Sequence, residues 1–169
     1  FRDIYREQVS PQAARFERRT RLNARGGANL GGAYSFGPPN FCHTFDYYIN
    51  ADKHMQDHPE WFSLRNGKRV GGQRHGQLCL TNPEVRDRIL EQMLVYIQKG
   101  IEEAKKNGVE PPHIYDLSHN DNQSYCECDR CREATEKYGL SGVNLNFVNS
   151  IAVEIAQKHP DVLICTWAY

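Results

Sequence analysis

Short apolar segments alternate with amphipathic helical patterns along the second half of this sequence, and no other feature restricts the possible folds as strongly. The apolar segments occupy residues 77–81, 113–118 and 162–168. Strands separated by helices of this length pair in parallel, because the helix returns the chain to the same end of the sheet. The alternation therefore predicts an α/β fold built on a parallel sheet, with strands at these three positions.

The interval between the first two segments carries the clearest helix signal. Apolar residues recur there at steps of four, as on a helix with one buried face: Val85, Ile89, Met93, Ile97 and Ile101. Asn82 and Pro83 are typical of a helix start, and Gly108 is typical of a stop. The pattern predicts a helix from Pro83 to about Asn107 that covers a sheet.

The other intervals are less regular. A short helix from Asp129 to Tyr138, stopped by Gly139, is expected to precede a second helix that begins at Ser141 and ends near His159. Nearer the amino terminus, the sequence predicts a helix over 11–25, a long irregular segment over 26–45, a short helix around 52–56 and a turn at 66–68.

The length limits the type of parallel fold. A complete eightfold barrel usually needs roughly 250 residues, and this sequence has 169. We therefore expect a single domain over residues 1–169 that forms a partial parallel (β/α) barrel of the TIM type. The sequence starts at Phe1 and lacks the pattern of a signal peptide, as expected of an excised or processed piece.

The charge of the chain excludes some partners. The 21 basic and 21 acidic residues cancel, which argues against binding to nucleic acid or to an anionic membrane. No apolar run approaches the roughly 20 residues of a membrane helix, so no membrane span is expected. The sequence does not indicate the oligomeric state.

A dense polar run, His119 to Asn122, follows the second predicted strand. In a parallel barrel the active site lies at the carboxyl ends of the strands. We interpret Asp121 as the candidate general acid, which needs a raised pKa to stay protonated. His119 is grouped with it as catalytic, and Asn120 and Asn122 are candidate partners for substrate hydroxyls. The alternative is an Asx turn that caps the next helix.

Further candidate substrate-binding residues lie at or near the expected rim: His43, Asn82, Tyr125, Trp167 and Tyr169. An aromatic ring on a barrel rim offers a stacking surface to a sugar, and core packing is an equal alternative for Trp167. Glycoside hydrolysis usually needs two carboxylates. Only Asp121 is convincing here, so the second would be Asp116 or a residue beyond Tyr169.

The cysteines form a second motif. Cys126, Cys128 and Cys131 fall within six residues, a spacing that lets several sulfurs turn toward one zinc ion. Cys79 is the best placed fourth ligand, with Cys42 or His43 as substitutes. Disulfides and free thiols remain alternatives for the six cysteines. A structural zinc ion is the cofactor expected at these cysteines. We expect catalysis to require no cofactor.

Several strings resemble a known family, the domain of unknown function 4838. They are Cys42 to Phe45, His58 to Phe62, Gln77 to Val85, Ser118 to Asn122, Tyr125 to Cys131, and Val148 with Asn149. The resemblance covers nearly the whole chain. It implies a TIM-type barrel related to glycoside hydrolases, including the α-glucuronidase and hexosaminidase groups, found mainly in bacteria that degrade polysaccharides and often exported to the periplasm or beyond.

Three functional hypotheses follow. The leading one is a glycoside hydrolase or other carbohydrate-active barrel that acts on a polysaccharide or an oligosaccharide. The second is a non-catalytic glycan-binding barrel, which the lack of a second acid favours. The third is a zinc-stabilised structural module. The sequence leaves open the sugar, its linkage and the stereochemical outcome.

Overall fold

A computed structural model gives the structure of the chain and describes residues 2–3, 22–23 and 35–167. The chain divides into two compact units, Phe1–Ser35 and Phe36–Tyr169. In the first unit, β1 (Arg2–Asp3) pairs in parallel with β2 (Leu22–Asn23). The helix predicted over 11–25 and the candidate residue Tyr169 lie outside the described residues.

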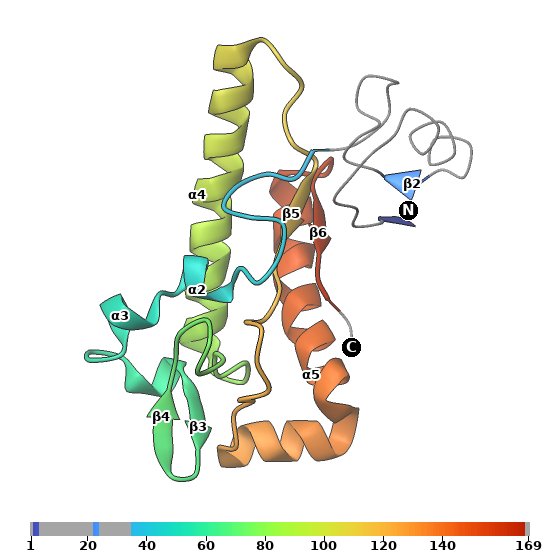
Figure 1. Ribbon diagram of the computed structural model, residues 1–169. Coiled ribbons are helices and arrows are strands. Elements are labelled where there is room, and N and C mark those ends of the chain that lie inside the picture. The colour runs from blue at the N-terminus through green and yellow to red at the C-terminus, as the bar shows by residue number, and fades with distance from the viewer. Residues whose placement is uncertain (1, 4–21, 24–34, 168–169) are drawn as a thin grey trace. The chain divides into compact units, whose positions relative to one another are not determined.

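The second unit contains the helices and strands on which the site is built (Figure 1). In chain order they are α2 (Phe45–Tyr48), α3 (Ala51–His54), the 3-10 helix η2 (Pro59–Trp61), β3 (Ser63–Arg65), β4 (Lys68–Val70), α4 (Pro83–Asn107), β5 (Ile114–Asp116), α5 (Asp129–Lys158) and β6 (Leu163–Cys165). The unit is a mixed α/β structure, as the sequence predicted. The described residues form no closed barrel.

The parallel sheet of this unit is small. β5 pairs in parallel with β6, with Asp116 opposite Cys165, and α5 is the crossover between them. On the other side of β5, Phe36 forms a single parallel bridge with Ile114. The strands predicted near 113–118 and 162–168 therefore form as β5 and β6, each shorter than the apolar segment that predicts it.

The strand predicted at 77–81 does not form, and this expectation was wrong. Leu78 makes only an isolated antiparallel bridge with Phe62. The backbone of this segment is bonded to residues just before the β3–β4 hairpin and at its start, since Cys79 N–H donates to the Trp61 carbonyl at 2.8 Å and Ser63 N–H to the Gln77 carbonyl at 2.9 Å. The apolar run is thus buried beside the hairpin and does not join β5.

Helix α4 matches its predicted bounds. Asn82 caps its start, because the side-chain oxygen accepts the Glu84 N–H at 3.0 Å, and Gly108 ends it in the left-handed conformation with φ 65°. Its buried face repeats at about four residues: Val85, Ile89, Met93, Ile97, Gly100 and Ala104. Gly100 allows close packing, since a Cβ there would lie 2.4 Å from the Tyr115 hydroxyl.

Helix α5 has two parts, as the sequence predicted. Gly139 has φ 72° and ψ 165°, which is not helical, and it separates a short first part from a long second part. Figure 1 shows the change of direction between them. The second part buries Phe147, Val148, Ile151 and Ile155, so this part covers the sheet.

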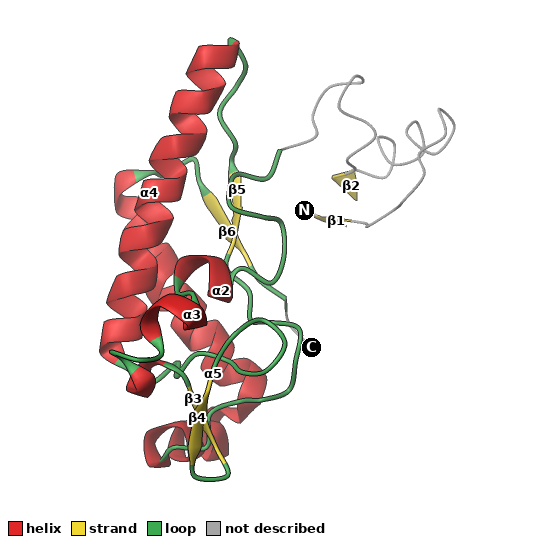
Figure 2. Ribbon diagram, turned by 60° about the vertical axis from the view of Figure 1, so that its left-hand side comes forward, coloured by secondary structure: helices red, strands yellow, loops and turns green. Residues whose placement is uncertain are grey.

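The two long helices cover one side of the strand pair (Figure 2). Tyr115 and Leu117 are fully buried in the same apolar core as the inner faces of α4 and α5. Each large apolar side chain buried there contributes roughly 1.5 to 3 kcal/mol. Because side chains alternate along a strand, Asp116 lies on the face of β5 opposite to these helices.

The hairpin of β3 and β4 turns at Asn66 and Gly67, with φ 48° and 75°. Two successive positive φ values are typical of the tight turn that asparagine and glycine favour, so the turn predicted at 66–68 is confirmed.

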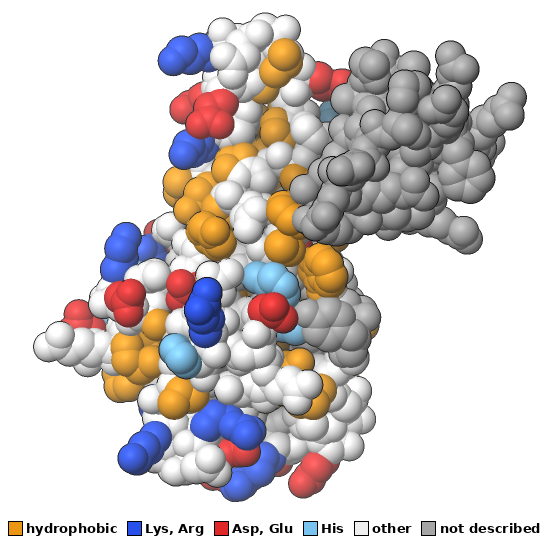
Figure 3. All heavy atoms as spheres, viewed as in Figure 1, with side chains coloured by type: hydrophobic (Ala, Val, Ile, Leu, Met, Phe, Trp, Pro, Cys, Tyr) orange, Lys and Arg blue, Asp and Glu red, His pale blue; other side chains and the backbone are white. Residues whose placement is uncertain are grey.

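No helix in the described part of the chain is long and apolar enough to cross a membrane. On the face seen in Figure 3, basic and acidic side chains are interspersed.

Candidate functional site

Four cysteines meet beside the amino-terminal end of α5. The Cys79 sulfur lies 3.7 Å from that of Cys128 and 3.8 Å from that of Cys131, and all four sulfurs, Cys126 included, lie within 4.8 Å of one another. In a regular tetrahedron with Zn–S bonds of about 2.3 Å, the sulfurs are about 3.8 Å apart. No disulfide joins these four cysteines, and the group could hold a metal ion.

Polar groups from neighbouring segments contact two of these sulfurs. Leu64 N–H donates to the Cys126 sulfur at 3.3 Å, and the Thr81 hydroxyl lies 3.1 Å from the Cys131 sulfur. The same hairpin is bound to the cysteine loop by a backbone bond of 2.8 Å from Glu127 N–H to the Leu64 carbonyl. Three segments that are distant in sequence therefore converge on the cluster.

The thiols of the cluster do not all ionise by themselves. Hydrogen bonds from Cys131 and Cys79 lower the pKa of Cys126, and the bond to Cys126 raises the pKa of Cys79 to about 11 and also raises the pKa of Cys131. Ionisation of Cys126 is thus favoured over ionisation of Cys79 and Cys131. A bound cation would instead stabilise all four thiolates.

A second cluster surrounds Asp116 at the end of β5. Its Oδ2 accepts hydrogen bonds from the Ser118 hydroxyl at 2.6 Å and the Thr44 hydroxyl at 2.9 Å, while its backbone carbonyl accepts one from the Tyr48 hydroxyl at 2.7 Å. Asp116, Thr44 and Ser118 are all fully buried. Oδ1 of Asp116 is also buried and has no hydrogen-bond partner in the described part of the chain.

Burial determines the ionisation of this carboxyl group. It raises the pKa of Asp116 from its ordinary value of 3.8 to about 6, although the bonds from Ser118 and Thr44 and the nearby His43 act in the opposite direction. The raised pKa that a general acid needs is thus found at Asp116. From the sequence we expected it at Asp121, and we named Asp116 as the possible second acid.

His43 lies against the same strand end. Its backbone N–H donates to the Ser118 hydroxyl at 2.7 Å, and its ring Nδ1 lies 2.9 Å from the His119 carbonyl. The ring stacks on Trp167, with centroids 5.8 Å apart. The structure therefore brings His43, His119 and Trp167 close to one another.

The polar run itself is largely used within the structure. His119 and Asn120 are buried, and Asn120 donates its side-chain N–H to the Gly76 carbonyl at 2.9 Å. The Gln77 side chain donates to the carbonyls of Asn120 and Asn122, both at 2.8 Å. These bonds hold the run against the loop that precedes residue 78. Hydrogen bonds within the protein therefore account for much of the polar character of the run.

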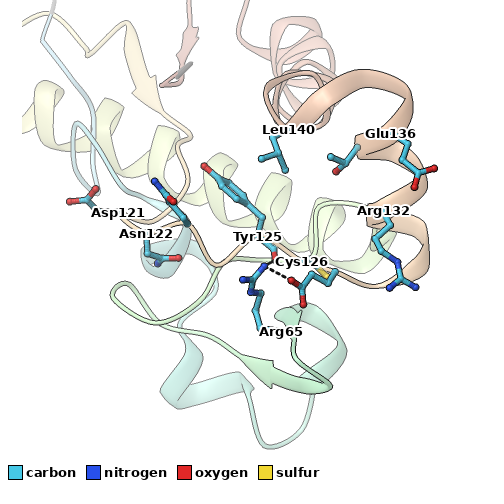
Figure 4. A pocket seen from close by; sticks show the side chains of 11 residues that line it. Arg65, Asp121, Asn122, Tyr125, Cys126, Arg132, Glu136 and Leu140 are labelled. Carbon is cyan, nitrogen blue, oxygen red and sulfur yellow. Dashed lines mark hydrogen bonds and ion pairs between the residues drawn. The ribbon is translucent and has the colours of Figure 1, made fainter.

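Asp121 is the exposed member of the run and lines an open depression of about 880 Å³. Figure 4 shows Asp121 and Asn122 at one end, Arg132 and Glu136 at the other, and Tyr125 between them. The Tyr125 ring also packs edge-on against His119, with centroids 5.9 Å apart. Four of the predicted catalytic and substrate-binding residues, Asp121, Asn122, Tyr125 and His119, thus lie in or beside one depression, and the predicted metal ligand Cys126 also lines it.

The remaining candidates have other positions. Asn82 is buried as the cap of α4 and donates to the Glu60 carbonyl at 3.3 Å, so the structure places it away from the depression. Trp167 is 39% exposed and lies beside His43. Tyr169 is outside the described residues.

Sequence reasoning missed Thr44 and Gln77, which organise the Asp116 cluster and the polar run. It also missed Glu127 and Glu136, two further carboxylates that line the depression with Asp121. Glu127 is paired with Arg65 at 2.6 Å. The proximity of Glu127 to the cysteines in the sequence was a usable signal, whereas nothing local marks Gln77.

The fold and these clusters define a mixed α/β protein with a cysteine group suited to a metal ion and a buried carboxyl group at the end of a parallel strand. The chain belongs to the family described as domain of unknown function (DUF4838), whose model matches residues 1–169. No curated protein is similar enough to match the chain.

Among solved structures, the chain is similar to an α-galactosidase from Lactobacillus brevis. The identity is 17%, the TM-score is 0.38, and the match covers 66% of this chain and 14% of that one. The chain therefore spans about a seventh of that protein. At such a score the similarity supports no conclusion about fold or activity.

Proposed function

We propose that this chain is a zinc-stabilised module in which one zinc ion is bound by Cys79, Cys126, Cys128 and Cys131. The spacing of the sulfurs carries the proposal, because separations of 3.7 and 3.8 Å equal the edges of a zinc tetrathiolate tetrahedron. Four protein ligands leave no open position on the metal, which is typical of a structural role.

The zinc ion would link segments that have little regular structure of their own. Cys79 lies before α4, Cys126 and Cys128 lie in the loop after β5, and Cys131 lies in the first turn of α5. The bond from Leu64 N–H to Cys126 adds the hairpin to the same unit. Metal binding therefore orders the wall of the depression that contains Tyr125 and Glu127.

The test is the metal content and coordination of the protein purified under reducing conditions. We expect about one zinc per chain and an X-ray absorption spectrum with four sulfurs at about 2.3 Å. Cys79→Ser should lose zinc, whereas Cys42→Ser and Cys165→Ser, outside the cluster, should keep it. Protein without metal, or with the four cysteines in disulfides, would contradict the proposal.

We also propose a carbohydrate-active function for the chain, as a glycoside hydrolase or a glycan-binding protein. In this proposal the β5–α5–β6 unit is part of a parallel barrel. It is favoured by the composition of the depression, where Asp121 and Asn122 lie with Tyr125 and two guanidinium groups. Carboxylates and amides match sugar hydroxyls, and an aromatic ring matches the C–H face of a pyranose. The placement beside the end of β5 is where parallel barrels bind substrates.

Incubation with neutral and uronic-acid oligosaccharides tests this proposal. Hydrolysis predicts sugar release that Asp121→Asn abolishes while the melting temperature stays nearly unchanged, because Asp121 is exposed. Binding without products would favour the glycan-binding form. Normal turnover by Asp121→Asn would remove Asp121 from the mechanism, and neither binding nor turnover of any sugar would refute the carbohydrate function.

A further inference from the structure

His43 has a backbone conformation that the surrounding structure must maintain. Its φ is 52°, in the left-handed region that only a few per cent of residues other than glycine adopt, histidine, asparagine and aspartate more often than the rest. Conformations of this kind persist where neighbouring contacts enforce them. Here the contact is a short bond of 2.7 Å from His43 N–H to the Ser118 hydroxyl.

Ser118 is in turn held by Asp116. The Ser118 hydroxyl donates to Asp116 Oδ2 at 2.6 Å, so its hydrogen is committed and its lone pair is directed at His43 N–H. Thr44, the next residue, donates its own hydroxyl to the same Oδ2 at 2.9 Å. The buried carboxyl group therefore fixes both residues of the His43–Thr44 turn.

The ring of His43 makes contacts of its own in addition to the backbone bond. Nδ1 lies 2.9 Å from the His119 carbonyl, and a carbonyl only accepts, so Nδ1 carries the hydrogen. When the ring carries a single hydrogen, Nε2 is therefore the acceptor nitrogen. Among the described residues, none forms a hydrogen bond with Nε2. Stacking on Trp167 keeps the ring in this plane.

We propose that the surface formed by His43 and Trp167 binds a sugar, that Nε2 of His43 accepts a hydrogen bond from a sugar hydroxyl, and that Asp116 is a positioning residue that holds His43 through Ser118. This surface is linked to the depression by His119, whose carbonyl contacts the His43 ring and whose own ring packs against Tyr125. This inference rests on the proposed carbohydrate function. The half-exposed Trp167 beside the ring supplies the apolar surface that the C–H face of a sugar needs.

The decisive variant is His43→Asn. Asparagine tolerates a positive φ and keeps a side-chain N–H in the place of Nδ1, but it has no atom in the place of Nε2. We expect a melting temperature close to that of the wild type and an affinity for the bound oligosaccharide about tenfold lower. His75→Asn, at an exposed histidine, is the matched control and should bind normally.

Nitrogen-15 spectra of the histidine rings test the geometry without any ligand. We expect His43 as the neutral tautomer with hydrogen on Nδ1, and its ring signals should shift when the oligosaccharide binds. Ser118→Ala should mix the tautomers of His43 and weaken binding, and Ser118→Thr, which restores a hydroxyl, should recover both. A purely structural role for Asp116 and Ser118 would change stability and leave the tautomer alone.

Each outcome decides one part of the inference. Hydrogen on Nε2 in the wild type, or unchanged affinity in His43→Asn, would overturn the role of His43. Binding that depends on His43 but not on Ser118 would remove Asp116 as the positioning residue. If no oligosaccharide binds the wild type, the carbohydrate function fails and the ligand role fails with it, while the spectra still establish which nitrogen of His43 is open.

Discussion

The cysteine cluster and the Asp116 cluster both contain buried or half-buried groups that become negative on ionisation, and they accommodate that charge in different ways. At the cysteines, four sulfurs lie within 4.8 Å of one another, two of the separations being 3.7 and 3.8 Å, an arrangement that a cation stabilises. At Asp116, a single carboxyl group with two hydroxyl donors keeps its proton to about pH 6. Gathered ligands thus favour a metal, whereas an isolated buried acid favours a proton.

Removing the metal should have the largest effect. The wild type treated with a chelator, and Cys79→Ser without it, should each lose at least about 4 kcal/mol of unfolding free energy, because zinc affinity is part of the folding free energy. Thermal melts with and without chelator measure this. Cys165→Ser is the control. A wild-type melting temperature that the chelator leaves unchanged would mean that no metal stabilises the cysteine cluster.

The next effect should be the pH dependence caused by Asp116. A folded pKa of about 6 against 3.8 in the unfolded chain means that the folded state binds more protons between these values, so stability falls as pH rises through that window. The difference corresponds to about 3 kcal/mol. Below about pH 4 the penalty is absent, and above about pH 6 it is complete.

Asp116→Asn removes this ionisation. The unfolding free energy of the wild type minus that of Asp116→Asn should therefore decrease by about 3 kcal/mol from pH 4 to pH 7. Denaturant titrations at several pH values measure it, with Asp121→Asn as the control at an exposed carboxylate of the same loop. A difference that rises with pH would mean that the folded state prefers the ionised form of Asp116.

The sequence predicted the parts of this structure that depend on local patterns. Helix α4 follows from its four-residue repeat with Asn82 and Gly108 at the ends, and the break of α5 follows from Gly139. Three members of the cysteine group were predictable because they lie within six residues, whereas Cys79 was chosen from an expected strand at 77–81 that does not form. In the helices and in these three cysteines, neighbours in sequence carry the physical signal.

The sequence could not predict contacts between distant segments. Thr44 and Asp116 are separated by 72 positions, and no pattern links them. Residues 77–81 have the composition of a buried strand, but pairing with the backbone at Trp61 and Ser63 decides their conformation. The polar run was assigned to ligand binding because its internal partner, Gln77, could not be recognised before the fold was known.

A smaller effect should come from the hydroxyl beside the cysteines. If the cluster holds zinc, Cys131 is a thiolate and the Thr81 hydroxyl donates to it across 3.1 Å. Thr81→Val should then weaken zinc binding about 10- to 100-fold in a chelator competition. Thr135→Val on α5 is the control. An unchanged affinity would mean that the hydroxyl does not support the metal-bound thiolate.

The smallest effect should come from the ion pair between the hairpin and the cysteine loop. Arg65 and Glu127 are 2.6 Å apart, but their side chains are 35% and 39% exposed, so water and salt screen the attraction. Arg65→Met, which keeps the apolar part of the side chain, should lower the unfolding free energy by less than about 1 kcal/mol, and by less still at high salt.

Thermal melts of the variant with and without zinc would extend the comparison between the two clusters. If zinc holds the hairpin through Cys126, the substitution should matter more after the metal is removed, because the ion pair is then one of the few remaining links between hairpin and loop. An equal cost in both states would mean that the metal and the ion pair stabilise the hairpin independently.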